Sequence, residues 1–227
     1  MEAFHVISTH PQILAGTGDC NSQYDVFGNF SRAITPNGTP SPHLQWDPTE
    51  QEIFDAITDK RLDEDSMAMI PEGMTARAFT AHVARERLRS AVPDVDTYCD
   101  AEINDSMYFT LFPNFHPWGA FNRINYRFRP VGTKVDECIM ECIYTEDFEG
   151  DERPAPAEYI ELGIDQEWTE LIPVIGNLAR VFHQDSFNLP KVQKGLETFR
   201  ADGLTLTKYQ EVKIRHWHAM AERFIAN

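Results

Sequence analysis

The sequence predicts an α+β fold, in which helices from both ends of the chain pack on one face of a curved antiparallel sheet. Two patterns predict this class. Residues 122–129 alternate apolar and polar side chains with a period of two, as in a strand with one exposed face. Residues 75–90 and 168–182 instead repeat apolar side chains at helical spacing. Strands in the middle of a chain and helices toward its ends are typical of the α+β class.

Length and charge limit the function. The chain has 227 residues, 42% of them hydrophobic, and no repeat or linker divides it, so we expect one domain over residues 1–227. Its formal net charge of -16 argues against nucleic acid and membrane surfaces as partners, because it would repel phosphate groups and anionic lipids. No apolar run reaches the roughly 18 residues that span a bilayer, and the start does not resemble a signal peptide. We therefore expect a cytoplasmic protein.

The first half of the chain contains one predicted strand and two predicted helices. Residues 23–33 are predicted to form a strand that ends in the proline- and glycine-containing turn at 35–42. Thr49 and Glu52 form a capping-box pattern, which predicts a short helix. Thr75 opens a second helix with arginines on its polar face. We expect these arginines to be solvated or to pair with nearby acids.

The middle of the chain supplies most of the sheet. Residues 106–112, 122–129 and 137–144 are predicted strands. The loops between them contain proline or glycine, as in an antiparallel meander. The acidic segment 146–156 has no apolar period, so we expect it to be a loop.

The last third of the chain is predicted to be helical. Residues 168–182 indicate a long helix with one apolar stripe against the sheet, kinked or softened at Pro173 and Gly176. Pro190 is predicted to restart a helix, because proline is favoured in the first helical turn. A capping pattern at Thr207 predicts one more helix at the end of the chain.

Two histidines near the start are the first candidates for chemistry. His5 and His10 lie five positions apart, which on a regular helix turns their side chains roughly 140° from one another. Both reach one metal only if the helix is loosened or broken between them. The zinc-peptidase pattern has two histidines four apart with a glutamate after the first, and no such base stands here. Taken alone, the spacing fits ordinary histidines as well as metal ligands.

A carboxylate later in the chain adds to this pair. The apolar stripe that includes Phe182 continues to Asp185, so this side chain points toward the core if the helix extends that far. A buried carboxylate needs a cation, hydrogen-bond donors or a metal, although a role at a helix end before Pro190 is the alternative. Two histidines and a carboxylate form the facial triad of non-haem Fe(II) oxygenases. His5, His10 and Asp185 are therefore candidate ligands.

The segments around these residues resemble those of a known family. Residues 1–12, Met-Glu-Ala-Phe-His-Val-Ile-Ser-Thr-His-Pro-Gln, look like an iron-binding segment in which a carboxylate three residues before the first histidine precedes His-x4-His. Residues 182–195 look like its third-ligand segment, with asparagine at +3 and glutamine at +8 from the aspartate. Further blocks match in order, at residues 24–42, 112–115 and 126–130. Over about residues 1–200 the chain resembles the catalytic domain of the alpha subunits of Rieske-type ring-hydroxylating oxygenases.

The resemblance implies a fold and a site. The fold would be a helix-grip (START/Bet v 1-like) fold, a curved antiparallel sheet wrapped around a long C-terminal helix and an apolar pocket. His5, His10 and Asp185 would hold Fe(II), and Glu2 would replace the family's carboxylate that links the iron histidines to the cluster of a neighbouring subunit. Other side chains are candidates for the substrate pocket, with core packing or turn formation as the alternative: Phe4, Phe112, Asn114, Phe115 and Phe182.

The implied activity is a hydroxylation. Members of this family insert hydroxyl groups derived from dioxygen into an aromatic or other apolar substrate. The resemblance implies electrons from NAD(P)H, delivered through a reductase or ferredoxin and a Rieske [2Fe-2S] cluster. This sequence contains neither the Cys-x-His nor the Cys-x-x-His pair that holds such a cluster. We therefore expect a truncated chain, with the cluster in a missing domain or a partner, and a homotrimer or alpha-beta hetero-oligomer for the intact enzyme.

Two other functions fit the same residues. A non-catalytic helix-grip module would bind an apolar small molecule, and this binding would survive chelation and the change His5→Ala. A zinc hydrolase would use the same triad, but it lacks a base between His5 and His10. The sequence leaves open the identity of the substrate and the choice between mono- and dioxygenation.

Overall fold

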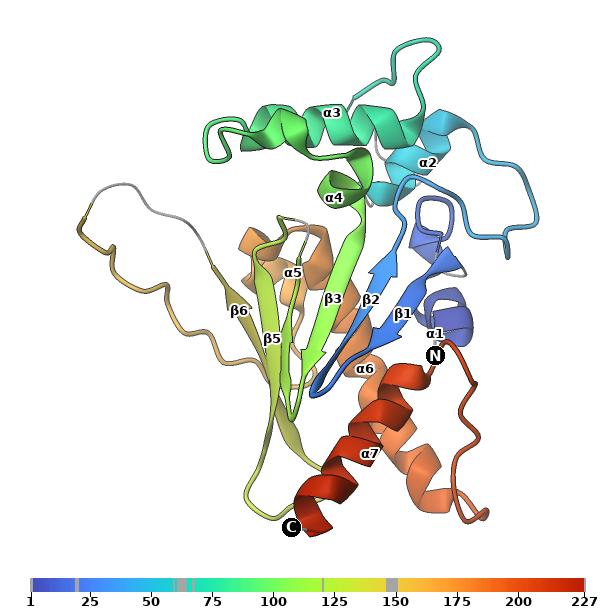
Figure 1. The fold of residues 1–227 in the computed structure, drawn as a ribbon, viewed down its shortest axis with the longest axis vertical. Coiled ribbons are helices and arrows are strands. Elements are labelled where there is room, and N and C mark those ends of the chain that lie inside the picture. The colour runs from blue at the N-terminus through green and yellow to red at the C-terminus, as the bar shows by residue number, and fades with distance from the viewer. Residues whose placement is uncertain are drawn as a thin grey trace.

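The computed structural model describes residues 2–18, 21–58, 60, 65–66, 68–119, 121–145 and 151–226, without the side chains of residues 2–4, 173 and 177. Its six strands form one curved sheet, with helices behind the sheet and at both of its ends (Figure 1). This arrangement confirms the α+β class and the helix-grip fold. Within the described ranges, no helix is long and apolar enough to cross a membrane.

The sheet is an antiparallel meander, because each strand pairs with the next one along the chain. The strands are β1 (Gln23–Val26), β2 (Phe30–Thr35), β3 (Ser106–Leu111), β4 (Phe115–Pro117), β5 (Ile124–Pro130) and β6 (Cys138–Tyr144). In β5, Ile124 and Tyr126 pack against the helices. Arg127 and Arg129 point to the other face, where both pair with Glu141 of β6. The period of two read from the sequence therefore separates the two faces correctly.

The helices form three groups (Figure 1). The first group is α1 (Glu2–Thr9) and the short 3-10 helix η1 (Pro11–Ile13). The second group lies at one end of the sheet and comprises α2 (Glu50–Ile57), α3 (Ala76–Leu88), η3 (Val95–Thr97) and α4 (Asp100–Asn104). The third group covers the sheet and comprises α5 (Trp168–Leu171), η4 (Pro173–Ile175), α6 (Asn177–Thr198) and α7 (Val212–Ala226). Of these, α6 runs behind the sheet and α7 packs against β1 and β2.

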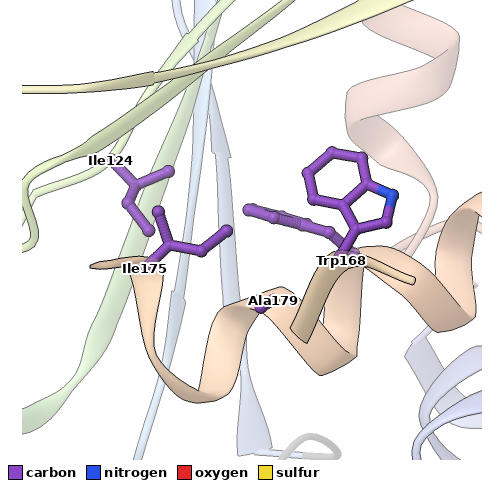
Figure 2. Packing of buried hydrophobic residues seen from close by; sticks show 5 residues of the cluster. Ile124, Trp168, Ile175 and Ala179 are labelled. Carbon is purple, nitrogen blue, oxygen red and sulfur yellow. The ribbon is translucent and has the colours of Figure 1, made fainter. Parts of the chain in front are cut away.

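One apolar cluster fixes α6 to the sheet. Figure 2 shows Ile124 of the sheet meeting side chains from the α5 to α6 region. The buried members of the cluster are Ile124, Trp168, Ile175, Ala179 and Phe182. Burial of each large apolar side chain contributes about 1.5–3 kcal/mol. The position of α6, and of every side chain on it, therefore follows from this packing.

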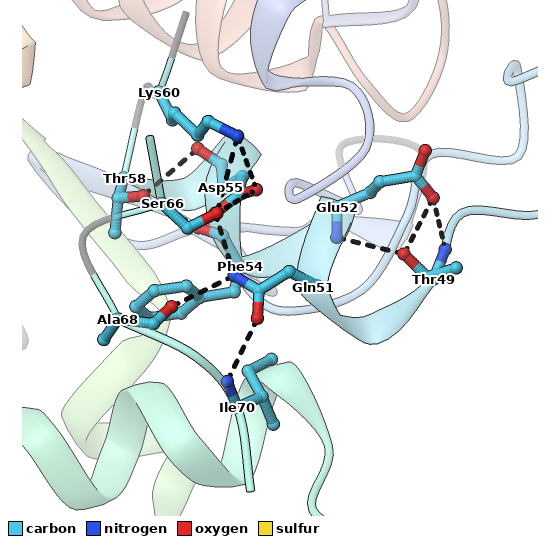
Figure 3. Close-up of polar contacts among 10 residues, drawn as sticks. All are labelled: Thr49, Gln51, Glu52, Phe54, Asp55, Thr58, Lys60, Ser66, Ala68 and Ile70. Atoms are coloured by element: carbon cyan, nitrogen blue, oxygen red, sulfur yellow. Dashed lines mark hydrogen bonds and ion pairs between the residues drawn. The ribbon is translucent and has the colours of Figure 1, made fainter. Parts of the chain in front are cut away.

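The start of α2 has the predicted capping box. The Thr49 amide donates to Glu52 Oε2 at 2.7 Å, and the Glu52 amide donates to Thr49 Oγ1 at 3.3 Å (Figure 3). Gln51 then holds the segment that follows the helix, since its amide donates to the Ala68 carbonyl and its oxygen accepts from the Ile70 amide. The helix is thereby fixed at its beginning and along one side.

The segment predicted as a single strand at 23–33 is a hairpin instead. β1 and β2 pair antiparallel, and the Phe27 amide donates to the Phe30 carbonyl across the turn at 2.9 Å. Gly28 and Asn29 form the turn, and both residue types favour turns. The prediction of one continuous strand was therefore wrong.

The long helix also differs from its prediction. Residues 168–182 form α5, η4 and the start of α6, because the backbone leaves the helical region twice, at Ile172 before Pro173 and at Gly176, which has a φ of 58°. The predicted restart at Pro190 is wrong, since α6 continues through Pro190 to Thr198. The fixed φ of proline is compatible with a helix, and its cost is confined to one missing N–H and a local clash. The predicted acidic loop is irregular over residues 151–156, and 146–150 lie outside the described residues.

A buried ion pair joins the helical end of the molecule to the sheet. Arg77 Nη1 on α3 lies 2.6 Å from Asp105 Oδ1. Asp105 links α4 to β3 and is buried. Asp105 also accepts from the Asn37 amide, while the Asn37 side chain donates to the Asn104 carbonyl and the Ser106 hydroxyl. This network holds together the end of β2, the start of α3 and the start of β3. It confirms that this arginine of α3 pairs with a nearby acid.

We predict that Asp105→Asn lowers the free energy of unfolding by about 2–4 kcal/mol, because the partly buried Arg77 guanidinium loses its counter-ion. Chemical denaturation followed by circular dichroism measures this change. The control is Asp96→Asn, which removes an exposed partner of Arg89 and should leave the denaturation midpoint unchanged. A parent-like midpoint for Asp105→Asn would contradict the role of the pair.

His116 lies on β4, in the layer between the sheet and the helices. Its ring stacks on Tyr126 with centroids 5.0 Å apart, and its Nδ1 lies 3.2 Å from Thr110 Oγ1. Burial lowers the pKa of His116 to about 4, and the nearby Lys213 ammonium acts in the same direction. The folded protein therefore holds this imidazole in its neutral form.

We predict that His116 makes the stability depend on pH. In the unfolded chain this imidazole binds its proton near pH 6.5, so the stabilisation present above that pH is lost as the pH falls toward 4. His116→Phe should remove about 2 kcal/mol of the difference in unfolding free energy between pH 7 and pH 4.5. Denaturation curves at both pH values measure it, with His82→Phe on the exposed side of α3 as the control. If His116→Phe keeps the parent's pH dependence, the assignment is wrong.

Candidate metal centre

His5 and His10 reach the same point because the helix ends between them. His5 lies within α1, which ends at Thr9. The His10 amide still donates to the Val6 carbonyl at 2.9 Å, but its φ of -124° and ψ of 50° leave the helical region. Pro11 then starts η1. The rotation of roughly 140° that a regular helix would impose is thereby avoided.

Asp185 is supplied by a distant part of the chain. It lies on α6, one turn after Phe182, whose ring belongs to the buried cluster. Side chains three positions apart share one face of a helix, so the packing of Phe182 aims Asp185 in a similar direction. Because α1 packs against α6, the carboxylate faces the two histidines.

The three ligand atoms form a nearly equilateral triangle. His5 Nε2 lies 3.1 Å from His10 Nε2, and Asp185 Oδ1 lies 3.1 Å from His5 Nε2 and 3.0 Å from His10 Nε2. Ligands at about 2.1 Å from a metal lie about 3.0 Å apart on an octahedral face and about 3.4 Å apart in a tetrahedron. The triangle therefore has the size of one octahedral face, which is the arrangement of a facial triad.

The charges at this point also suit a cation. Burial alone would raise the pKa of the Asp185 carboxyl, but the His10 and His5 imidazoles that face it hold the pKa below its ordinary value. The carboxylate is therefore ionised and directs its charge at two ring nitrogens. Lone pairs that converge in this way repel one another unless protons or a cation lie between them. Two imidazoles and one carboxylate are a donor set that Fe(II) accepts, so the residues present fit the metal.

The group is open on one side only. The His10 side chain is 4% exposed, whereas those of His5 and Asp185 are 24% and 25% exposed. His10 thus forms the buried wall of the site, and the other two ligands border the accessible side. The two cavities described in the structure lie elsewhere, one beside Phe121 and the other between the β1–β2 turn and α7.

The remaining candidates are placed in different environments. Phe182 lies one turn before Asp185 on α6, in the buried cluster, with its ring 5.7 Å from that of Trp168. Phe112 stacks on Phe224 of α7. The Asn114 amide donates to the Phe128 carbonyl, as a turn residue does, and Phe115 is 37% exposed. Of these candidates with described side chains, only Phe182 shares a helix turn with a member of the triad, and its contacts are those of core packing. The side chains of Glu2 and Phe4 lie outside the described residues.

Two residues of the site escape the sequence argument. Gln184 contacts His10 at Nδ1, the ring nitrogen that does not face His5 and Asp185, and Gln12 donates to Gln184. Both fall inside the segments that carry the ligands, one two positions after His10 and the other directly before Asp185. Neither glutamine is charged or part of an apolar repeat. The only signal in the sequence is that each lies within two positions of a candidate ligand.

Comparison with known proteins assigns the chain to a family. The family model described as "Ring hydroxylating alpha subunit (catalytic domain)" matches residues 1–227. The comparisons with curated proteins and with solved structures gave no significant match. The matched family is the one that the histidine and aspartate segments resemble, and its model extends over every element described above. The chain belongs to the family of ring-hydroxylating alpha-subunit catalytic domains.

Proposed function

We propose that this domain hydroxylates an aromatic or other apolar substrate with dioxygen, using one Fe(II) held by His5, His10 and Asp185. The observation that carries the proposal is the triangle of ligand atoms, with sides of 3.0 to 3.1 Å. The family supports the general activity, which is that of an oxygenase. The metal, its ligands and the substrate class are the parts that we add.

The chain's own residues have three tasks in this reaction. When bound, the iron supplies the site at which dioxygen is activated. His5, His10 and Asp185 would hold the iron through the three atoms that converge on one point. His10 closes the buried side, so that substrate enters past His5 and Asp185.

The surroundings of Asp185 favour an apolar substrate. The Phe182 ring lies 5.7 Å from Trp168 and 6.0 Å from Tyr126, both toward the sheet. Aromatic rings exclude water and offer edges and faces to another ring. Phe182 is therefore the best-supported substrate contact. The other candidate substrate contacts stay predictions: Phe4, Phe112, Asn114 and Phe115. The structure gives Phe112 a packing contact with Phe224, and it gives Asn114 the hydrogen bond of a turn residue.

The electron supply involves partners. We propose that electrons from NAD(P)H pass through a reductase or ferredoxin and a Rieske [2Fe-2S] cluster on a neighbouring domain or subunit. Glu2, at the start of α1, is our candidate for the carboxylate that links the iron site to that cluster. We propose a homotrimer or an alpha-beta hetero-oligomer as the assembly and the cytoplasm as its location.

The size of the triangle also distinguishes this function from a zinc hydrolase. A tetrahedral zinc site would place its ligand atoms about 3.4 Å apart, which is wider than the triangle formed here. A binding module without a metal would gain nothing from three converging lone-pair atoms on side chains that are 4% to 25% exposed. The geometry therefore supports an octahedral metal.

We predict that the purified chain binds one equivalent of Fe(II) under anaerobic conditions. Ligand binding at 100 times the dissociation constant should add about 2.7 kcal/mol to the stability, seen as a rise in the unfolding temperature. His5→Ala and Asp185→Ala should each abolish both effects, because each removes one of three ligands. His218→Ala, on the exposed side of α7, is the matched control and should bind as the parent does. Absence of stoichiometric binding in the parent would contradict the proposal.

We also predict that the iron-loaded chain hydroxylates aromatic compounds with hydrogen peroxide. Peroxide supplies both the oxygen atoms and the two electrons, so this reaction needs neither a reductase nor a cluster. Labelled peroxide and mass spectrometry distinguish the outcomes, because dioxygenation adds two labelled oxygens to an arene and monooxygenation adds one and releases water. Asp185→Ala should give no labelled product, whereas His218→Ala should give as much as the parent. Equal product from parent and Asp185→Ala would refute the role of the triad.

A further inference from the structure

A pair of glutamines lies behind His10. Gln184 Oε1 is 2.8 Å from His10 Nδ1, and the Gln12 amide donates to the same oxygen at 2.9 Å. The Gln184 amide in turn lies 3.4 Å from Gln12 Oε1, which it can reach as a longer second hydrogen bond. The His10 side chain is buried, so these contacts lie away from solvent.

The contact with Gln184 selects one tautomer of His10. An amide oxygen only accepts, so His10 Nδ1 must carry a proton to bond to it. With a metal bound, this would be the only ring proton, and Nε2, which faces His5 and Asp185, would supply its lone pair to the metal. We propose that Gln184 and Gln12 are positioning residues that fix His10 in this tautomer and prepare it to bind the metal. This inference rests on the proposed function.

Gln12 determines which end of the Gln184 amide faces His10. If Gln184 alone turned its amide, its NH2 group would face the NH2 group of Gln12, and two donors would meet without an acceptor. Turned in this way, Gln184 would donate to Nδ1 and leave the proton of His10 on Nε2, where it blocks the ligand atom. The reciprocal pair therefore opposes a turn of the Gln184 amide alone.

The pair also joins the two segments that supply the ligands. Gln12 belongs to η1, directly after His10, and Gln184 belongs to α6, directly before Asp185. Both glutamines are neutral. Among His5, His10 and Asp185, the negative charge comes from Asp185. A carboxylate in place of Gln184 would still accept from Nδ1 and would make the imidazole a stronger base. Gln184→Glu is therefore the conservative variant that retains the tautomer.

The first experiment reads the tautomer directly in the metal-free chain. Ring-nitrogen chemical shifts of 15N-histidine-labelled protein, assigned by comparison with His10→Ala, show whether Nδ1 of His10 carries a proton. We expect Nδ1–H in the parent, in Gln184→Glu and in the control Gln23→Leu, an exposed glutamine of β1. Gln184→Leu should lose this preference. Gln12→Leu, which keeps the His10 contact, should show a mixture of the two tautomers.

The second experiment measures Fe(II) affinity in the same variants. Loss of a hydrogen-bonding partner behind a metal-binding histidine weakens binding by about 10- to 100-fold, which is the effect expected for Gln184→Leu. Gln12→Leu should show a smaller loss, and Gln184→Glu and Gln23→Leu should bind at least as tightly as the parent. Should Gln184→Leu fail to fold, Gln12→Leu and Gln184→Glu still test both readouts.

The outcomes separate this inference from the proposed function. Nε2–H as the main tautomer of the parent would overturn the inference. So would parent-like affinity in Gln184→Leu when the parent itself binds Fe(II), and in that case the proposed function would stand. A parent that binds no iron contradicts the proposed function, while the tautomer measurement still decides the role of the two glutamines.

Discussion

The contact between the first turns of the chain and the middle of α6 is the constraint on which the site depends. It brings His5 and His10 next to Asp185, which lies 175 positions after His10 in the sequence. Neither segment forms the candidate site alone, since two of the proposed ligands lie on one and the third on the other. The apolar cluster beneath Phe182 fixes α6 to the sheet, and α1 is then placed by its contact with α6. The sheet therefore contributes to the site mainly by holding α6 still.

Local patterns account for much of the fold. The alternation in residues 122–129 predicts β5 and its two faces, and the capping pattern at Thr49 predicts the start of α2 with both of its hydrogen bonds. These features depend on neighbours in sequence, which is why the sequence shows them. The hairpin of β1 and β2 has a local signal as well, the Gly28–Asn29 turn, which the prediction of one strand passed over. The continuation of α6 through Pro190 has none, and the residues that follow are mostly exposed, so packing does not explain it either.

The site is predictable only in part, and for a different reason. Spacing suggested that His5 and His10 could share a metal only if the helix broke, and the backbone of His10 does leave the helix. The approach of Asp185 has no local signal, because nothing in the spacing of two segments reveals that they touch. The resemblance to a family supplied that step. Gln12 and Gln184 were missed because their importance lies in the direction of two amides, which residue type does not encode.

Anomalous diffraction at the iron absorption edge tests the central claim most directly. Crystals of the chain grown or soaked anaerobically with Fe(II) should show one strong anomalous peak at coordinating distance from His5 Nε2, His10 Nε2 and Asp185 Oδ1, about 2.1 Å from each. The same peak should be absent in crystals of Asp185→Ala. A peak at other residues, or no peak while the three side chains keep their positions, would contradict the account.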